Sequence, residues 1–176
     1  MRIALGSDHR GYHAKANIRA LLQELNQEVV DFGTDSTKPM DYPDTAIAAA
    51  LAVQRGECDL GVLFCGTGIG MSITANKLRG IRAALCHDEL TAEMARRHNN
   101  ANILCLPADL VGDALMRRVV EVWLKTPYEG GRHERRVHKI SQIEASQCDG
   151  RPLDPTEFAS GCGNGLDNHA PPPESP

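Results

Sequence analysis

The sequence contains no apolar run of the length that a membrane-spanning helix requires, which is about 18 residues. Its first residues, 1–9, reach a charge at Asp8 before the apolar core of a signal peptide could form, so we expect a cytoplasmic protein. The 23 acidic residues only slightly outnumber the 19 lysines and arginines, which gives a formal net charge of −4. Such a weak charge exerts no general attraction on nucleic acids or anionic membranes, so neither is expected as a partner.

The cysteines form no CxxC pair and lack the spacing of a zinc site. They are Cys58, Cys65, Cys86, Cys105, Cys148 and Cys162. In a chain of 176 residues without a secretion signal, they are expected to be free thiols, mostly buried, rather than a disulfide framework. The sequence also lacks internal repeats, and its length fits one α/β domain.

Five short aliphatic or β-branched runs alternate with longer amphipathic stretches. The runs cover residues 2–5, 29–32, 60–64, 82–85 and 102–106. Their nearly continuous apolar character is typical of strands buried on both faces of a parallel sheet.

The stretches between the runs have helical patterns. Residues 14, 18, 21, 22 and 25 share one apolar helical face, and Asp41 with Tyr42 and Pro43 predicts a second helix start. Further helices are expected from Asp88 to about residue 97, from about 110 to 125 with Trp123 in the core, and from near Arg136. This alternation predicts a three-layer α/β/α doubly wound (Rossmann-like) fold with a five-stranded parallel sheet and a C-terminal helix.

The composition changes at about Cys148, after which Gly, Pro, Asn and Ser dominate. This segment cannot bury enough apolar surface to become ordered, so we expect a mobile tail at 148–176 and a folded domain at 1–147. Doubly wound sheets bind ligands at the carboxyl ends of their strands, so chemically active residues are sought directly after each run.

The strongest motif, Cys-Gly-Thr-Gly-Ile-Gly-Met-Ser at 65–72, follows the third run. Its alternating glycines allow several N–H groups to point into one concavity, and a helix N-terminus follows. Such a loop could hold a phosphate, a carboxylate or a developing oxyanion, and a thiol at its mouth is expected to ionise more readily. It is not a dinucleotide fingerprint, because Met71 stands where a third glycine is needed, and it is not a P-loop. A tight turn with a buried Cys65 is the alternative.

Weaker motifs combine charges with histidine. Ser-Asp-His-Arg-Gly at 7–11 could bind sugar hydroxyls and a phosphate, or it could be a helix cap beside a solvated histidine. The histidine of Arg-Arg-His-Asn-Asn at 96–100 could be a general acid or base, or part of a basic helix end. Arg132 and Arg136, four residues apart, could clamp a phosphate or lie in a solvated basic turn. His9 and His13 have the spacing of a metal pair, but no third ligand is present, so no metal is expected.

Seven segments carry a resemblance to a known family and occur in its order over residues 1 to about 147. They are Gly-Ser-Asp-His at 6–9, Asp-Tyr-Pro at 41–43, the 65–72 motif, Ala-Asn-Lys at 75–77, Gly-Ile-Arg-Ala at 80–83, His-Asn-Asn-Ala-Asn at 98–102 and Tyr-Glu-Gly-Gly-Arg at 128–132. The chain resembles the sugar-phosphate isomerases that include ribose-5-phosphate isomerase B and the galactose- and allose-6-phosphate isomerases.

The resemblance implies catalytic roles for three residues. Cys65 matches the general base that removes the carbon-bound proton, Thr67 a group that assists proton movement between the substrate oxygens, and His98 the residue that opens the furanose ring. The resemblance implies no cofactor and no metal. It also implies at least a homodimer, because each pocket of the family is built from two subunits.

It also implies a set of substrate contacts. Asp8 and Asn99 match ligands of the sugar hydroxyls, and His9, Arg132 and Arg136 match ligands of the phosphate. The full set of expected contacts is Asp8, His9, Asp41, Tyr42, Gly66, Thr67, Gly68, Ile69, Gly70, Ser72, Asn99, Arg132 and Arg136.

One position departs from the family pattern. Relatives usually carry an arginine that reaches the phosphate where this chain has Asp109. An acid facing a phosphate dianion repels it, so either Asp109 points away or the substrate differs. Arg117 and Arg118 lie further along, but nothing in the sequence indicates that they compensate.

The expected activity is the interconversion of ribose 5-phosphate and ribulose 5-phosphate through a cis-enediolate. The loop at 66–70 would stabilise the developing oxyanion, and Cys65 would move the proton. Two alternatives remain open. The same chemistry could act on allose or galactose 6-phosphate, a tetrose phosphate or a free sugar, or the chain could be a non-catalytic sugar-phosphate-binding subunit.

Overall fold

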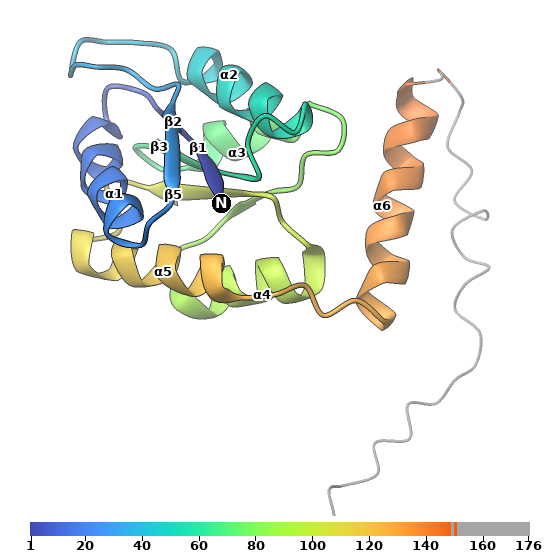
Figure 1. Cartoon of the computed structure of the whole chain (residues 1–176). Coiled ribbons are helices and arrows are strands. Elements are labelled where there is room, and N and C mark those ends of the chain that lie inside the picture. Colours follow the sequence, from blue (N-terminus) through green and yellow to red (C-terminus); the bar gives the residue numbers. More distant parts are fainter. Residues whose placement is uncertain (149, 151–176) are drawn as a thin grey trace, which may run out of the picture. The chain divides into compact units, whose positions relative to one another are not determined.

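The computed structural model describes residues 1–148 and 150, and the predicted tail at 148–176 falls almost entirely outside them. The elements are β1 (Arg2–Ser7), α1 (Tyr12–Glu24), β2 (Glu28–Asp31), α2 (Tyr42–Gln54), β3 (Leu60–Cys65), α3 (Ile69–Ala75), β4 (Ala83–Leu85), α4 (Glu89–Asn99), β5 (Ile103–Pro107), α5 (Asp113–Lys125) and α6 (Arg132–Cys148) (Figure 1). All five expected strands and the alternation with helices are confirmed. The described residues divide into a compact unit, Met1–His138, and a second unit that begins within α6 at Lys139.

The sheet has the order β2-β1-β3-β5-β4, and every neighbouring pair of strands is parallel. Helices α1, α4 and α5 cover one face, and α2 and α3 cover the other (Figure 1). The three-layer α/β/α prediction is therefore confirmed. Because β3 lies in the centre of the sheet, every one of its residues is buried, as its continuous apolar sequence indicates.

Two hydrophobic clusters fill the spaces between the layers. Alternate residues of each central strand point to opposite faces, so Val62 and Phe64 join one cluster while Leu63 and Cys65 join the other. Trp123 of α5 is fully buried in the first cluster, as expected. The burial of these large side chains is the principal favourable contribution to the stability of the fold.

Helix α6 begins earlier than the sequence predicted. Its first residue is Arg132 rather than a residue near Arg136, because Gly130 and Gly131 adopt positive φ angles of 68° and 55° and end the preceding segment at that point. The early start puts Arg132 and Arg136 one helical turn apart on the same helix. Among the described helices, none has both the length and the apolar character needed to cross a membrane.

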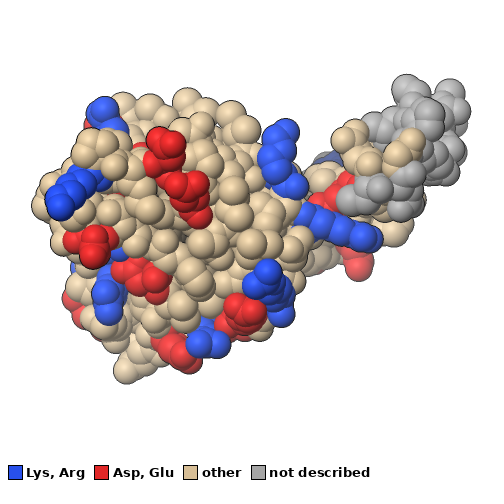
Figure 2. All heavy atoms as spheres, turned by 90° about the horizontal axis from the view of Figure 1, so that it is seen from above, with Lys and Arg blue, Asp and Glu red and all other residues tan. Residues whose placement is uncertain are grey.

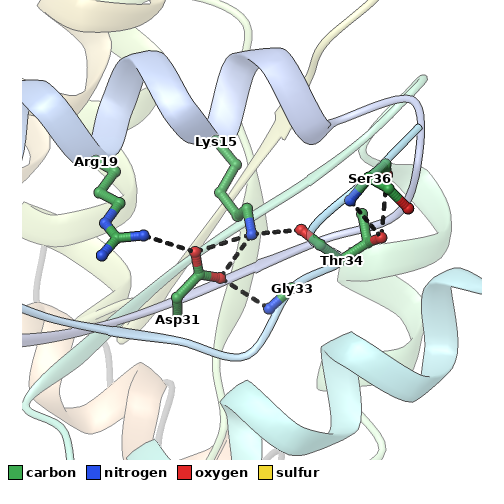
Figure 3. Close-up of polar contacts among 6 residues, drawn as sticks. All are labelled: Lys15, Arg19, Asp31, Gly33, Thr34 and Ser36. Atoms are coloured by element: carbon green, nitrogen blue, oxygen red, sulfur yellow. Dashed lines mark hydrogen bonds and ion pairs between the residues drawn. The ribbon is translucent and has the colours of Figure 1, made fainter.

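An ion pair between the buried Lys15 and the partly exposed Asp31 joins α1 to the edge strand β2. Lys15 is 5 % exposed, and its Nζ donates to Asp31 Oδ1 at 2.7 Å and Oδ2 at 2.9 Å and to the carbonyl oxygen of Thr34 at 2.7 Å (Figure 3). The N–H of Gly33 donates to Asp31 Oδ1, and Arg19 lies 3.7 Å from Oδ2. A hollow of about 350 Å³ lies beside this network. Since the ammonium has three acceptors, we interpret the network as a structural tie.

Basic and acidic side chains are interspersed on the face drawn in Figure 2, rather than gathered by sign. On this face, an anionic ligand must therefore be recognised by a local arrangement of donors rather than by a broad patch of positive charge.

Candidate active site

The carboxyl ends of β1, β3 and β5 lie side by side because β3 is between the other two. Ser7 is in register with Phe64, and Cys65 is in register with Pro107. Backbone hydrogen bonds continue past the strand ends: the N–H of Asp8 donates to the carbonyl of Phe64 at 3.2 Å, and that of Asp109 to Gly66 at 3.0 Å. These hydrogen bonds join the segments that follow the three strands at the carboxyl ends of the strands.

A pocket of about 460 Å³ opens at the carboxyl ends of these strands. Its lining residues are Asp8, Arg10, Tyr42, Cys65, Gly66, Thr67, Ile69, Gly70, Ile73 and Asp109. The motif at 65–72 thus supplies half of the lining, at the place where the doubly wound fold predicts a ligand site.

Cys65 lies in this pocket and is 5 % exposed. The N–H of Gly68 donates to its Sγ at 3.1 Å, an interaction that is stronger with a thiolate than with a thiol. The other cysteines described lie outside the pocket: burial raises the pKa of Cys86 to about 11 and raises the pKa values of Cys58 and Cys105, so all three remain thiols at neutral pH. Cys65 is therefore the cysteine whose position in the pocket allows it to react with a bound substrate.

The loop that holds Cys65 depends on its glycines. Gly68 has a φ angle of 73°, and a Cβ there would lie 2.5 Å from Leu85 Cδ1 and 3.2 Å from the carbonyl carbon of Leu106. A Cβ on Gly66 would overlap the carboxylate of Asp109 and lie 2.7 Å from Nε of Arg10. Only glycine allows the loop to fold this tightly against its neighbours.

We expect Gly68→Ala to destabilise the protein and to lower its activity. Gly80→Ala is the matched control, because Gly80 has a φ angle of 75° but a Cβ there would meet nothing within 4 Å. The control isolates the backbone cost of about 1–2 kcal/mol, and Gly68→Ala should lower the free energy of unfolding by more than that. Chemical denaturation of both variants tests this, and equal losses would contradict the packing argument.

Arg10 and Asp109 form an ion pair at the mouth of the pocket. Nε of Arg10 donates to Asp109 Oδ2 at 2.7 Å, and Nη2 lies 2.5 Å from the same oxygen. Asp109 thus neither points away from the pocket nor stands alone, an arrangement that the sequence did not suggest. Arg117 and Arg118 do not compensate, because they pair with Glu24 and Glu89.

Three further expected contacts surround the pocket. Asp8 is buried, and its Oδ1 accepts the N–H groups of Arg10 at 2.9 Å and Gly11 at 3.0 Å, so the carboxylate also shapes the turn before α1. Nδ1 of His9 is 3.2 Å from both the N–H and the carbonyl of Met40, so its tautomer decides which one it bonds. Tyr42 lines the pocket from the first turn of α2.

Two more of the expected contacts, Asp41 and Ser72, are not among the residues that line the pocket. Asp41 is the N-cap of α2, although its side chain makes no capping hydrogen bond. The hydroxyl of Ser72 donates to the carbonyl of Ala83 at 3.2 Å and so ties α3 to β4.

A second cluster of functional groups lies at the end of α4 and the start of α6. The rings of His98 and His133 stack with centroids 4.0 Å apart, and a nitrogen of each is 4.0 Å from the carboxylate of Glu129. Nη2 of Arg97 donates to Glu129 at 3.1 Å, and Nε of Arg132 donates to His133 Nε2 at 3.3 Å. These contacts form one polar network around His98.

The second cluster lies at the amino ends of the strands, whereas Cys65 lies at their carboxyl ends. His98 precedes β5, whereas Cys65 is in register with Pro107 at the end of β5. The five residues of β5 separate its amino end from its carboxyl end by about 16 Å. Within one chain, His98 therefore does not reach a substrate held against Cys65.

His98, Glu129 and His133 each offer a ligand atom, and within the described residues these atoms lie within 4.8 Å of one another. In the described structure, Arg97 donates to one carboxylate oxygen of Glu129 and Arg132 donates to Nε2 of His133. The three residues are therefore part of a hydrogen-bonded network.

Burial lowers the pKa of His133, and the charges of His98, Arg132 and Arg136 add to this effect while Glu129 opposes it. The unfolded chain consequently binds this proton more readily, so stability should fall as the pH drops below about 6.5. We expect His133→Phe, which keeps a stacked ring, to reduce the loss of Tm between about pH 7.5 and pH 5.5. Calorimetry at both values tests this, and an undiminished loss would contradict it.

Comparison with known proteins identifies the family. The family model described as Ribose/Galactose Isomerase matches residues 3–140. The chain belongs to this family. Ribose-5-phosphate isomerase B of Escherichia coli is 48% identical over 143 residues, covering 81% of this chain and 96% of the relative. D-erythrulose-4-phosphate isomerase of Pectobacterium atrosepticum is 41% identical over 146 residues, covering 82% and 95%.

Solved structures of this isomerase family agree with the fold. Ribose-5-phosphate isomerase B of Clostridium thermocellum superposes with a TM-score of 0.83 at 49% identity, covering 84% of this chain and 99% of the other. The enzyme of Mycoplasma genitalium, solved with bound ribulose-5-phosphate, gives a TM-score of 0.79 at 42% identity, covering 82% and 96%.

The residues that the family resemblance singled out fall into two groups in this isomerase. Asp8, Tyr42, Cys65, Thr67 and the rest of the loop line the pocket or border it. The second group lies near the amino ends of the strands and consists of His98, Asn99, Arg132 and Arg136. Arg10, which belongs to the motif at 7–11, and Ile73 were not expected individually as site residues, although both line the pocket. The position of Arg10 directly after His9 was the available signal.

Proposed function

We propose that this isomerase interconverts ribose 5-phosphate and ribulose 5-phosphate. The observation that carries the proposal is the Cys65 thiol, which lies in the pocket with an N–H donor on its sulfur and a glycine loop beside it. The named activities of the Escherichia coli and Clostridium thermocellum relatives support the same substrate.

In the proposed mechanism, Cys65 as a thiolate takes the proton from C2 of the open-chain aldose. The C2–H electron pair forms the C1–C2 double bond, and the carbonyl oxygen on C1 becomes an oxyanion. The protonated Cys65 then returns the proton to C1, while a proton moves from the oxygen on C2 to the oxygen on C1 with help from the Thr67 hydroxyl. N–H donors of the 66–70 loop stabilise the oxyanion, each by about 3–4 kcal/mol in a comparable site.

A second copy of the chain completes the site in this proposal. The partner would supply His98, Asn99, Arg132 and Arg136, because in their own chain these residues lie near the amino ends of the strands, away from the Cys65 pocket. Exposed apolar side chains at the pocket rim support this: Ile69 is 51% exposed and Ile73 is 57% exposed. A second copy would cover them. Light scattering should give a mass of at least twice the 19.1 kDa of one chain.

Direct turnover of ribose 5-phosphate by the purified protein tests the substrate. Rapid formation of ribulose 5-phosphate is the expected result. Absence of turnover would overturn the assignment and direct the assay to allose and galactose 6-phosphate and to free sugars. Binding of these ligands without any turnover would support a non-catalytic subunit instead.

A tetrose phosphate is the second candidate substrate. The named activity of the Pectobacterium atrosepticum relative on D-erythrulose 4-phosphate is the specific observation that favours it. The ratio of kcat/KM for ribose 5-phosphate to that for erythrulose 4-phosphate decides between the two, because it measures the difference in transition-state binding.

Two broader assignments complete the proposal. The isomerase domain comprises residues 1–147, which includes the matched range 3–140. The location is the cytoplasm, where a reducing environment would keep the buried cysteines as thiols.

A further inference from the structure

We propose that Arg10, held in place by Asp109, binds the phosphate group of the substrate at the mouth of the Cys65 pocket. This inference rests on the proposed function, because it assigns the anionic end of a sugar phosphate. Arg10 and Asp109 would together make one recognition element, although they are 99 positions apart in the sequence.

Within one chain, the charges of the pocket favour such an element. Among its lining residues, Arg10 is the one lysine or arginine, while Asp8 and Asp109 carry carboxylates. A phosphate dianion entering a site with two carboxylates is repelled unless a cation faces it. The carboxylate of Asp8 is buried and already accepts two backbone N–H groups, so it is partly neutralised by local dipoles.

The strand order fixes where the guanidinium lies. Arg10 follows β1 and Asp109 follows β5, and these strands flank β3. The ion pair therefore spans the loop that begins at Cys65, and it packs so closely on Gly66 that a Cβ there would overlap the Asp109 carboxylate. The phosphate end of the substrate would then lie beside the loop that holds its reacting carbons.

The contacts leave Arg10 with donors to spare. Asp109 Oδ2 occupies Nε and Nη2. Both hydrogens of Nη1 have no partner among the described residues, and the side chain, which lines the pocket, is 60% exposed. A fixed guanidinium edge of this kind suits two phosphate oxygens. Asp109 thereby acts as a positioning residue, since it orients Arg10 without binding the anion.

The test compares four proteins: wild type, Arg10→Ala, the double variant Arg10→Ala/Asp109→Ala, and Arg55→Ala. Arg55 is the matched control, because it is 62% exposed and paired with Glu57 but lies outside the pocket. For each protein, kcat and KM are measured with ribose 5-phosphate. Calorimetry gives the Kd for inorganic phosphate, a readout that does not depend on turnover.

We expect Arg10→Ala to raise KM and the phosphate Kd by roughly 10- to 100-fold, with a much smaller change in kcat. The double variant should recover part of this loss, because it also removes the carboxylate that Arg10→Ala leaves unpaired at the pocket mouth. Arg55→Ala should match the wild type.

Unchanged KM and phosphate affinity in Arg10→Ala would overturn the inference while leaving the isomerase activity established. A double variant no better than Arg10→Ala would overturn the role of Asp109. Conversely, Arg10-dependent phosphate binding in a wild type without sugar-phosphate turnover would support the anion site and refute the proposed function.

Discussion

Replacement of Cys65 by serine is expected to lower kcat with ribose 5-phosphate by roughly 10³- to 10⁴-fold, at the upper end of what a general base contributes. The serine hydroxyl would occupy nearly the same place, but it stays protonated at neutral pH and is a far weaker base than a thiolate. The N–H of Gly68, which donates to the sulfur at 3.1 Å, would lose its thiolate acceptor. KM should change little, because the ligands of the sugar and phosphate remain.

Cys58→Ser is the matched control for loss of a thiol. Cys58 is also buried, and burial raises its pKa. It precedes β3, so it lies at the end of this strand that is remote from the pocket. Its kcat should equal that of the wild type. Circular dichroism and Tm confirm that both variants are folded. A Cys65→Ser protein with nearly wild-type kcat would remove Cys65 from the mechanism, and the base would have to be sought elsewhere in the pocket.

The position of Cys65 could be predicted because it depends on local signals. A continuous apolar run marks β3, the glycines that follow it mark a turn, and ligands of a doubly wound sheet bind just beyond such strand ends. Each of these signals is contained within about a dozen residues of sequence. The alternation of strands and helices is equally local, which is why all five strands were found.

The pairing of Arg10 with Asp109 could not be predicted in this way. It depends on the spatial order of the strands, in which β1 and β5 flank β3, and the periodicity of a sequence does not specify that order. The bond between Lys15 and Asp31 is similar, since it joins a helix to an edge strand through long side chains. Taken alone, Asp109 was therefore interpreted as a charge that would repel phosphate.

The assignment of residues to each half of a shared pocket also needed the structure. The family motifs name Cys65 and His98 together, and nothing in their sequence indicates that they lie at opposite edges of the sheet. The register of β3 with β5 shows the separation, because Cys65 pairs with Pro107 while His98 lies before Ile103. The resemblance implied a pocket built from two subunits, and the geometry of one chain indicates which residues would form each of the two half-sites.

The two half-sites lead to the second large effect, the recovery of activity when two inactive variants are mixed. Cys65→Ser and His98→Asn should each have very low activity, because each lacks one of the groups required at the pocket. If each pocket takes Cys65 from one copy and His98 from the other, a mixed dimer contains one pocket with both groups intact. Random exchange of equal amounts should then restore about one quarter of the wild-type activity, as symmetric pairing implies.

Coexpression of the two variants with different affinity tags, followed by sequential purification, isolates the mixed dimers, whose activity should be about one half of the wild-type activity because one of their two pockets is intact. Cys65→Ser mixed with Thr67→Ala is the matched control: both residues lie on the same loop, so every pocket retains a defect and no activity should return. Recovery in the first mixture but not in the second requires that a pocket combine side chains from two chains. If neither mixture exceeds the residual activity of its components, His98 acts on no shared pocket, and its network with Glu129 and His133 would be assigned to stability alone.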